Sequence, residues 1–191
     1  MNLILASQSP RRRELLGLFR TPFTVRAADI DESMDLTQLP AQEVARVSRL
    51  KAEAIARTPE DVVIAADTIV VCDDAVLGKP VDEADAFRML SLLSGRAHQV
   101  MTGLTVLRGD KAITCTEITD IHFRSLTPGE IRSYIRTGEP MDKAGAYGIQ
   151  GGAALFATGI HGDYFNVVGL PVCRLGQILR ELAPELMEDI Q

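Results

Sequence analysis

Tryptophan is absent from this 191-residue sequence and other aromatics are few, with three Tyr and six Phe. A core with so few rings must be filled by branched aliphatic side chains and alanine, which fits the 46% hydrophobic content. Typical domains run about 100–200 residues, and neither a linker-like segment nor a repeat divides this chain. We therefore expect one domain over residues 1–191.

Long hydrophobic runs are also missing. A membrane-spanning helix needs roughly 18 or more apolar residues in succession, and no run approaches that length. The opening MNLILASQSPRRR places its positive charge after a very short apolar run, which is the reverse of the order in a secretory signal peptide. We expect a cytoplasmic protein that has no membrane partner.

Cysteine and positive charge are both in short supply. Cys72, Cys115 and Cys173 form an odd, widely spaced set without a CxxC pair, which argues against a disulfide framework or a zinc site and fits a reducing compartment. With 20 basic against 26 acidic residues, the net charge of −6 argues against a protein that coats nucleic acid or an anionic membrane. No aromatic stacking platform is visible either, so we expect no nucleic-acid partner.

Short apolar runs alternate along the chain with segments of helical periodicity. This alternation, together with a hairpin around Gly109-Asp110-Lys111, predicts an α/β domain with a mixed sheet. Ser9-Pro10 is a helix start signal, and Thr127-Pro128-Gly129-Glu130 is a capping box. We expect strands at 3–6, 23–27, 62–71, 99–108 and 112–123, strand-like pieces at 154–157 and 166–168, and helices at 10–19, 40–57, 83–93, 128–138 and 171–182.

Arg11, Arg12 and Arg13 occupy the first turn of the first expected helix. Each cation there costs about 0.3–1 kcal/mol, because the helix dipole favours negative charge at this end. A bound anion would reverse that sign, since backbone N–H groups, the Ser7 and Ser9 hydroxyls and an arginine would converge on it. The alternative is that the arginines extend into solvent, and it is strongest for Arg13. We favour an anion site, and the missing P-loop lysine pattern argues against a Walker-type NTPase.

Asp67 interrupts the otherwise apolar run VVIAADTIVV, and a carboxylate in a buried strand needs a partner or a purpose. It could mark a structural kink, hydrogen-bond neighbouring backbone amides, or lie where the strand enters a cleft near a metal and a phosphate. An adjacent anion site favours the last interpretation. Phosphate-ester cleavage needs a base to orient water and a hard cation held by carboxylates.

Lysines form a third candidate set. Lys79 and Lys143 lie in glycine-bounded loops, and Lys51 lies on the second expected helix. Such lysines can reach polyphosphate oxygens as point charges, although a lone lysine is more often a solvated surface residue. The acidic loop at 29–35, which contains Glu32, could bind a metal or be a charged surface loop.

Five motifs follow one another along the chain: ASQSPRRREL at 6–15, AADTIV at 65–70, LGKP at 77–80, DKAGAYGIQG at 142–151 and NVVGLP at 166–171. Their identity and order resemble the Maf family of nucleoside triphosphate pyrophosphatases over nearly the whole chain. The resemblance implies the inosine-triphosphatase-like fold, a mixed, strongly twisted sheet flanked by helices that forms two lobes around a deep cleft. It also implies a cytoplasmic enzyme, often a homodimer, that uses a divalent metal cation, Mg²⁺ or Mn²⁺.

The family's positions carry over residue by residue. By this resemblance Asp67 is the proton acceptor, and Arg11, Thr68 and Gln150 are linked to substrate choice. Asp67 or Glu32 would hold the cation. The remaining candidates match the lining of the family's cleft or follow from the phosphate-binding arguments above; they are Arg12, Glu32, Lys51, Lys79, Lys143, Ser7 and Ser9.

The loop from Ala146 to Gly151 resembles the branch that hydrolyses dTTP and UTP, and it lacks the Ser-Phe sequence of the 7-methyl-GTP branch. The Gln150 carboxamide suits this substrate, because it offers a donor and an acceptor to the N3–H and a carbonyl of uracil or thymine. The resemblance predicts that dTTP, UTP or modified pyrimidine triphosphates yield the monophosphate and pyrophosphate. The alternative is a nucleotide-binding regulator of cell division and septum formation with incidental hydrolysis.

Overall fold

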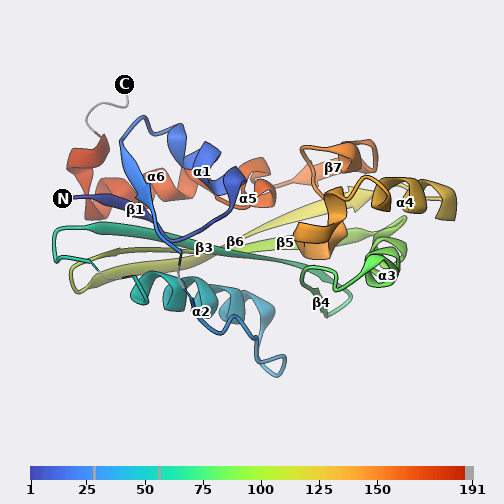
Figure 1. Ribbon diagram of the computed structural model, residues 1–191, viewed down its shortest axis with the longest axis horizontal. Coiled ribbons are helices and arrows are strands. Elements are labelled where there is room, and N and C mark those ends of the chain that lie inside the picture. The colour runs from blue at the N-terminus through green and yellow to red at the C-terminus, as the bar shows by residue number, and fades with distance from the viewer. Residues whose placement is uncertain (28, 56, 188–191) are drawn as a thin grey trace. The chain divides into compact units, whose positions relative to one another are not determined.

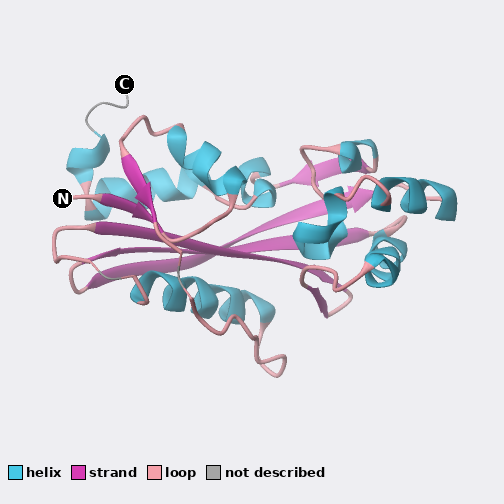
Figure 2. Ribbon diagram, viewed as in Figure 1, coloured by secondary structure: helices cyan, strands magenta, loops and turns pink. Residues whose placement is uncertain are grey.

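The computed structural model describes residues 1–27, 29–55 and 57–187. Within these ranges a seven-stranded sheet has the order β2 (Phe23–Val25), β1 (Leu3–Leu5), β3 (Val62–Cys72), β5 (Ala97–Arg108), β6 (Lys111–Phe123) and β7 (Ala157–His161), with β4 (Ala75–Leu77) paired to β3. β1 is parallel to β2 and β3, whereas β3–β4 and β6–β7 are antiparallel. Helices flank this mixed sheet, as Figure 2 shows. The predicted α/β fold class is therefore confirmed, whereas the cleft between two lobes and the single domain stay predictions.

The chain divides into two compact units. Unit 1 contains residues 1–67, 102–117 and those from 169 onward, and unit 2 contains residues 68–101 and 118–168. Unit 1 carries α1 (Pro10–Gly17), α2 (Pro40–Glu53), α6 (Val172–Leu182) and the 3₁₀ segment η4 (Pro184–Met187). Unit 2 carries α3 (Glu83–Leu93), α4 (Pro128–Ile135), α5 (Tyr164–Val168) and the 3₁₀ segments η1 (Glu139–Asp142), η2 (Ala144–Ala146) and η3 (Gly152–Leu155).

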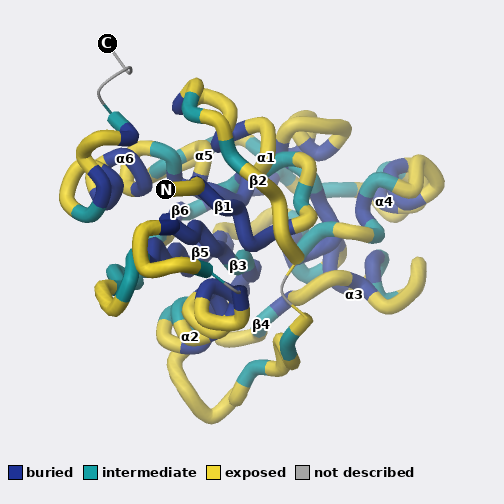
Figure 3. Tube along the Cα trace, turned by 60° about the vertical axis from the view of Figure 1, so that its left-hand side comes forward, coloured by how far each residue is buried: buried dark blue, intermediate teal, exposed yellow. Residues whose placement is uncertain are grey.

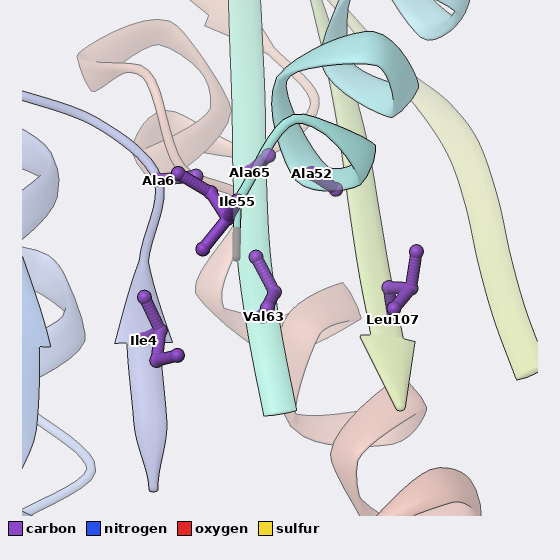
Figure 4. Packing of buried hydrophobic residues seen from close by; sticks show 7 residues of the cluster. All are labelled: Ile4, Ala6, Ala52, Ile55, Val63, Ala65 and Leu107. Carbon is purple, nitrogen blue, oxygen red and sulfur yellow. The ribbon is translucent and has the colours of Figure 1, made fainter. Parts of the chain in front are cut away.

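In unit 1, α2 covers one face of the sheet, and α1 and α6 lie on the other (Figure 1). Because helices cover both faces of the sheet here, β1 is buried along its length, and so is the first part of β3 (Figure 3). Aliphatic side chains and alanines fill the space between α2 and the sheet, as expected from the scarcity of aromatics. Figure 4 shows this cluster, which consists of Ile4, Ala6, Ala52, Ile55, Val63, Ala65 and Leu107.

In unit 2, α3 packs against α4 and against the η1 and η2 segments. The few aromatic side chains concentrate here, and the His98, Phe123 and Tyr147 rings meet edge to face. His98 Nε2 lies 2.9 Å from the Tyr147 hydroxyl. Burial, with a smaller contribution from the charge of His122, lowers the pKa of His98 to about 4.

Local start signals in the sequence are confirmed. The Ser9 side chain accepts a hydrogen bond from Arg12 N with Pro10 at the first helical position, so α1 begins where the motif indicates. The Thr127 hydroxyl and the Glu130 carboxylate cap each other's backbone N–H groups at the start of α4. The three cysteines are free. Among the described residues, no helix combines the length and the apolar character that crossing a membrane demands.

Two expected strand pieces are wrong. Residues 152–155 form η3, and the strand begins only at Ala157, where β7 pairs with β6. Residues 166–168 lie in the short helix α5, not in a strand. There Asn166 is buried and donates to Val100 O and Thr119 Oγ1, so a tertiary contact overrides the strand propensity of the valines.

The second expected helix is too long at its C-terminal end. α2 stops at Glu53 rather than at 57, and residue 56 lies outside the described residues. The prediction also missed β4, which follows the two-residue turn at Asp73-Asp74; both turn residues have positive φ.

Candidate active site

At the junction between β1 and α1, the Ser7 side chain contacts both Ser9 and Arg12. The Ser7 hydroxyl oxygen accepts from Ser9 N at 3.2 Å and from Arg12 Nη1 at 3.2 Å. A hydroxyl has one donor and two acceptor positions. With both acceptor positions used, the Ser7 hydrogen is left to donate to a further acceptor, and a phosphate oxygen is such an acceptor. The helix N-terminus beside it favours negative charge.

Arg12 lies along this junction and does not extend into solvent. Its Nε donates to Gly169 O at 2.8 Å, in addition to the bond to Ser7. Burial lowers the pKa of Arg12, the negative charges of Asp67 and Glu32 oppose that shift, and the positive charge of Arg11 adds to it. Arg12 is thus a half-buried cation close to two carboxylates. Arg13 is exposed, as the solvent alternative predicted for it.

Lys51 joins the two candidate carboxylates. Its Nζ lies 2.8 Å from Glu32 Oε2 and 2.8 Å from Asp67 Oδ1. Lys51 is 7% exposed, whereas Glu32 is exposed and Asp67 is half-buried. The ammonium is positioned by α2, Asp67 by the middle of β3, and Glu32 by the loop that precedes α2. Asp67 in the strand thus has a charged partner in Lys51, and its expected place near a metal and a phosphate stays a prediction.

An ion pair on α2 holds the loop that carries Glu32. The buried Glu43 accepts from Asp35 N at 2.8 Å and pairs with Arg46 at 2.7 Å. Arg46 also donates to Ser33 O at 2.9 Å, so the loop backbone is tied to the helix on either side of Met34. Sequence reasoning missed Glu43 and Arg46. Their i,i+3 spacing on a helix would have indicated the ion pair, but not the loop contacts.

The remaining predicted residues belong to unit 2. Thr68 follows Asp67 in β3 and is half-buried, while Lys79 and Gln150 are exposed on loops. Lys143 is half-buried and donates to Glu139 O at 2.7 Å and to Asp142 Oδ1 at 2.6 Å. The site roles of these four residues stay predictions.

The described residues contain no group of three or more His, Cys, Asp or Glu side chains that could hold a metal ion. Two carboxylate oxygens do converge on one cationic atom, Lys51 Nζ, from Glu32 and Asp67. Mg²⁺ in nucleotide enzymes is commonly bound by one or two carboxylates, and substrate phosphates and water complete the shell. The pair supplies two oxygen ligands of the kind that a hard divalent cation binds.

Comparison with known proteins assigns the chain to a family. The sequence model described as Maf-like protein matches residues 2–182. The chain belongs to the Maf family. A relative from Symbiobacterium thermophilum, named dTTP/UTP pyrophosphatase, is 51% identical over 180 residues, which cover 94% of this chain and 93% of that protein. A protein of the same name from Moorella thermoacetica is 51% identical over 181 residues, covering 93% of each chain.

This Maf protein also matches a solved structure. The HAM1 protein from Coxiella burnetii aligns with a TM-score of 0.49 and 14% identity, over 95% of this chain and 99% of that chain. Membership in the Maf family confirms the resemblance carried by the five sequence motifs.

Proposed function

We propose that this protein hydrolyses dTTP and UTP between the α- and β-phosphates, giving the nucleoside monophosphate and pyrophosphate. The observation that carries the proposal is the Lys51 ammonium, 2.8 Å from both Glu32 and Asp67, two carboxylates whose charge also acts on Arg12 in the first turn of α1. Two relatives that are 51% identical over more than nine-tenths of the chain are named dTTP/UTP pyrophosphatase, and they support the substrate class. A chemically modified pyrimidine triphosphate would fit the same reaction.

Asp67 is the proposed proton acceptor. Its Oδ1 accepts from Lys51, which fixes the orientation of the carboxylate, and Oδ2 is the atom proposed to orient the water. The water oxygen forms a bond to the α-phosphorus and loses its proton to Asp67. The bond from that phosphorus to the bridging oxygen breaks, and pyrophosphate leaves with the electron pair. Positioning and charge stabilisation account for most of the rate in such reactions.

The phosphate-binding groups in unit 1 are the proposed anion ligands. The Ser7 hydroxyl and the first backbone N–H groups of α1 donate to phosphate oxygens, and Arg12 and Lys51 supply positive charge. When bound, a divalent cation, Mg²⁺ or Mn²⁺, would be held by Asp67 and Glu32 and would supply charge to the departing pyrophosphate. Arg11, Thr68, Lys79 and Lys143 are proposed as further substrate contacts.

Gln150 is proposed to select the base. Its side chain is exposed on a short loop, where the carboxamide can donate to a carbonyl of uracil or thymine and accept from N3–H. Cytosine presents a different donor and acceptor pattern and leaves part of that pairing unmade, which disfavours it. A cytoplasmic location and a homodimer belong to the same proposal.

The test is a panel of purified nucleotides, dTTP, UTP, CTP, ATP and GTP, each with Mg²⁺ or Mn²⁺. Pyrophosphate and orthophosphate are measured separately. We expect dTTP and UTP to give pyrophosphate and the monophosphate in equal amounts, and the other nucleotides to react more slowly. Orthophosphate alone would indicate a different reaction. A nucleotide that binds and is released unchanged would favour the regulator of cell division instead.

A further inference from the structure

The loop that carries Gln150 is anchored at both ends by one pair of side chains. Gly148 N donates to the Tyr134 hydroxyl at 3.0 Å, and that hydroxyl donates to Glu139 Oε1 at 2.8 Å. The second carboxylate oxygen, Glu139 Oε2, accepts from Gly152 N at 3.0 Å. The residues between these two anchored amides are 149–151, with Gln150 in the middle.

The glycines of this loop let its backbone lie against the carboxylate. A Cβ at Gly151 would fall 2.2 Å from Glu139 Oε1, and one at Gly148 would fall 3.0 Å from the same atom. A Cβ at Gly152 would lie 3.1 Å from the Tyr134 ring. The glycine-rich stretch from Gly148 to Gly152 is therefore matched to Glu139 and Tyr134 in their observed positions.

Tyr134 and Glu139 are themselves held firmly. Tyr134 is 5% exposed on α4, and its ring meets Phe156 edge to face at 5.2 Å. Burial raises the pKa of Tyr134, so its hydroxyl stays protonated as a donor. Glu139 begins η1, and its backbone carbonyl accepts from Lys143 Nζ at 2.7 Å. Within the loop Ile149 is 8% exposed, so the loop is also anchored by an apolar side chain while Gln150 stays at the surface.

We propose that Glu139 and Tyr134 are positioning residues for Gln150 and thereby control the preference for uracil and thymine over cytosine. The inference rests on the proposed function of Gln150. Discrimination by a carboxamide requires a defined position, because a mobile amide can rotate or shift to satisfy the wrong base as well. Two hydrogen-bonded amides on either side of Gln150 supply that position.

Glu139→Gln and Tyr134→Phe test the proposal. Glutamine replaces one acceptor oxygen by a donor, so it cannot accept from both Gly152 N and the Tyr134 hydroxyl. Phenylalanine keeps the Tyr134 ring against Phe156 and removes only the hydroxyl, so it covers the case in which the Glu139 variant fails to fold. Glu83→Gln is the matched control, because Glu83 is an exposed acid on α3 of the same unit.

The measured quantity is the ratio of kcat/KM for dTTP to kcat/KM for CTP, from pyrophosphate release. We expect the ratio to fall about tenfold or more in both variants, mainly through KM for dTTP, as polar base discrimination is lost. The control keeps the wild-type ratio. Adding Glu139→Gln to Gln150→Ala should lower the ratio no further than Gln150→Ala does alone, since both changes act on one contact.

Hydrogen exchange provides a readout that does not depend on activity. The amides of Gly148 and Gly152 should exchange faster in Glu139→Gln than in the wild-type protein and in Glu83→Gln. A wild-type protein without a preference for dTTP over CTP contradicts the proposed function itself. A wild-type preference that survives in both Glu139→Gln and Tyr134→Phe contradicts the inference alone, even if the loop amides exchange faster.

Discussion

Lys51 forms ion pairs with both carboxylates of the candidate site. A buried ammonium is costly unless it is paired, and here it contacts Glu32 and Asp67 at 2.8 Å each. The half-buried Arg12 adds a second cation whose pKa responds to the same two carboxylates. Two cations and two carboxylates thus act on one another in this part of unit 1.

The substitution Asp67→Asn tests the proposed role of Asp67 as the proton acceptor. Asparagine keeps the size of the side chain and one oxygen to accept from Lys51, so the fold should stay intact while the proposed proton acceptor is lost. We expect kcat to fall by about 10²–10⁴, the usual contribution of a general base. Pyrophosphate release measures the effect, and circular dichroism checks folding.

Asp110→Asn is the control for this substitution, because Asp110 is an exposed residue of the turn between β5 and β6. It should leave kcat unchanged. If Asp67→Asn turned over dTTP at nearly the wild-type rate, Asp67 could not be the base.

At the scale of the elements, α2 packs tightly against β5 at Gly103. Gly103 lies in β5, and a Cβ there would be 2.2 Å from Val44 O and 2.5 Å from Val44 C of the helix backbone. Backbone atoms cannot rotate away as a side chain does, so the whole helix would have to move. Because α2 also carries Lys51, Glu43 and Arg46, its packing against β5 determines where these three side chains lie.

We expect Gly103→Ala to lower the free energy of unfolding by about 1–3 kcal/mol, the usual range for overpacking. Gly17→Ala is the matched control, since a Cβ at Gly17 meets nothing within 4 Å and the residue ends a helix. That change should be neutral or slightly stabilising, because alanine restricts the unfolded chain. Urea unfolding of both variants measures the difference, and equal midpoints would refute the close packing of α2.

Over the whole molecule, His98 makes stability depend on pH. Burial and the charge of His122 lower the pKa of His98 to about 4, against an ordinary value near 6.5. Between these values the unfolded chain binds a proton that the folded chain does not. This contribution is therefore fully present above pH 6.5 and is lost as the pH falls toward 4.

The shift corresponds to at most about 3 kcal/mol of unfolding free energy. We expect the urea midpoint of the wild-type protein to decrease from pH 7 to pH 5, and His98→Gln to weaken that decrease. His161→Gln should retain the wild-type pH dependence, because His161 is exposed on β7. An identical decrease in the wild-type and His98→Gln proteins would show that His98 binds its proton equally in both states.

Sequence reasoning succeeded where the signal was local. The Ser9 and Thr127 caps and the five motifs could be recognised in the sequence, because each depends on residues a few positions apart. It failed at residues 166–168, which have a strand-like sequence but form part of a helix. There the buried Asn166 hydrogen-bonds to partners 47 and 66 residues away in the sequence.

The sequence by itself determined the α/β class, the family membership that its motifs imply, and the set of candidate site residues. Only the tertiary structure decided which of them meet. Lys51 reaches Glu32 and Asp67 across 19 and 16 residues, and Arg12 reaches the carbonyl of Gly169 across 157. Caps and motifs are specified by residues that are neighbours along the chain. The contacts of Lys51 and Arg12 join distant residues, so they form only when the helices pack on the sheet and water is excluded from the space between helix and sheet.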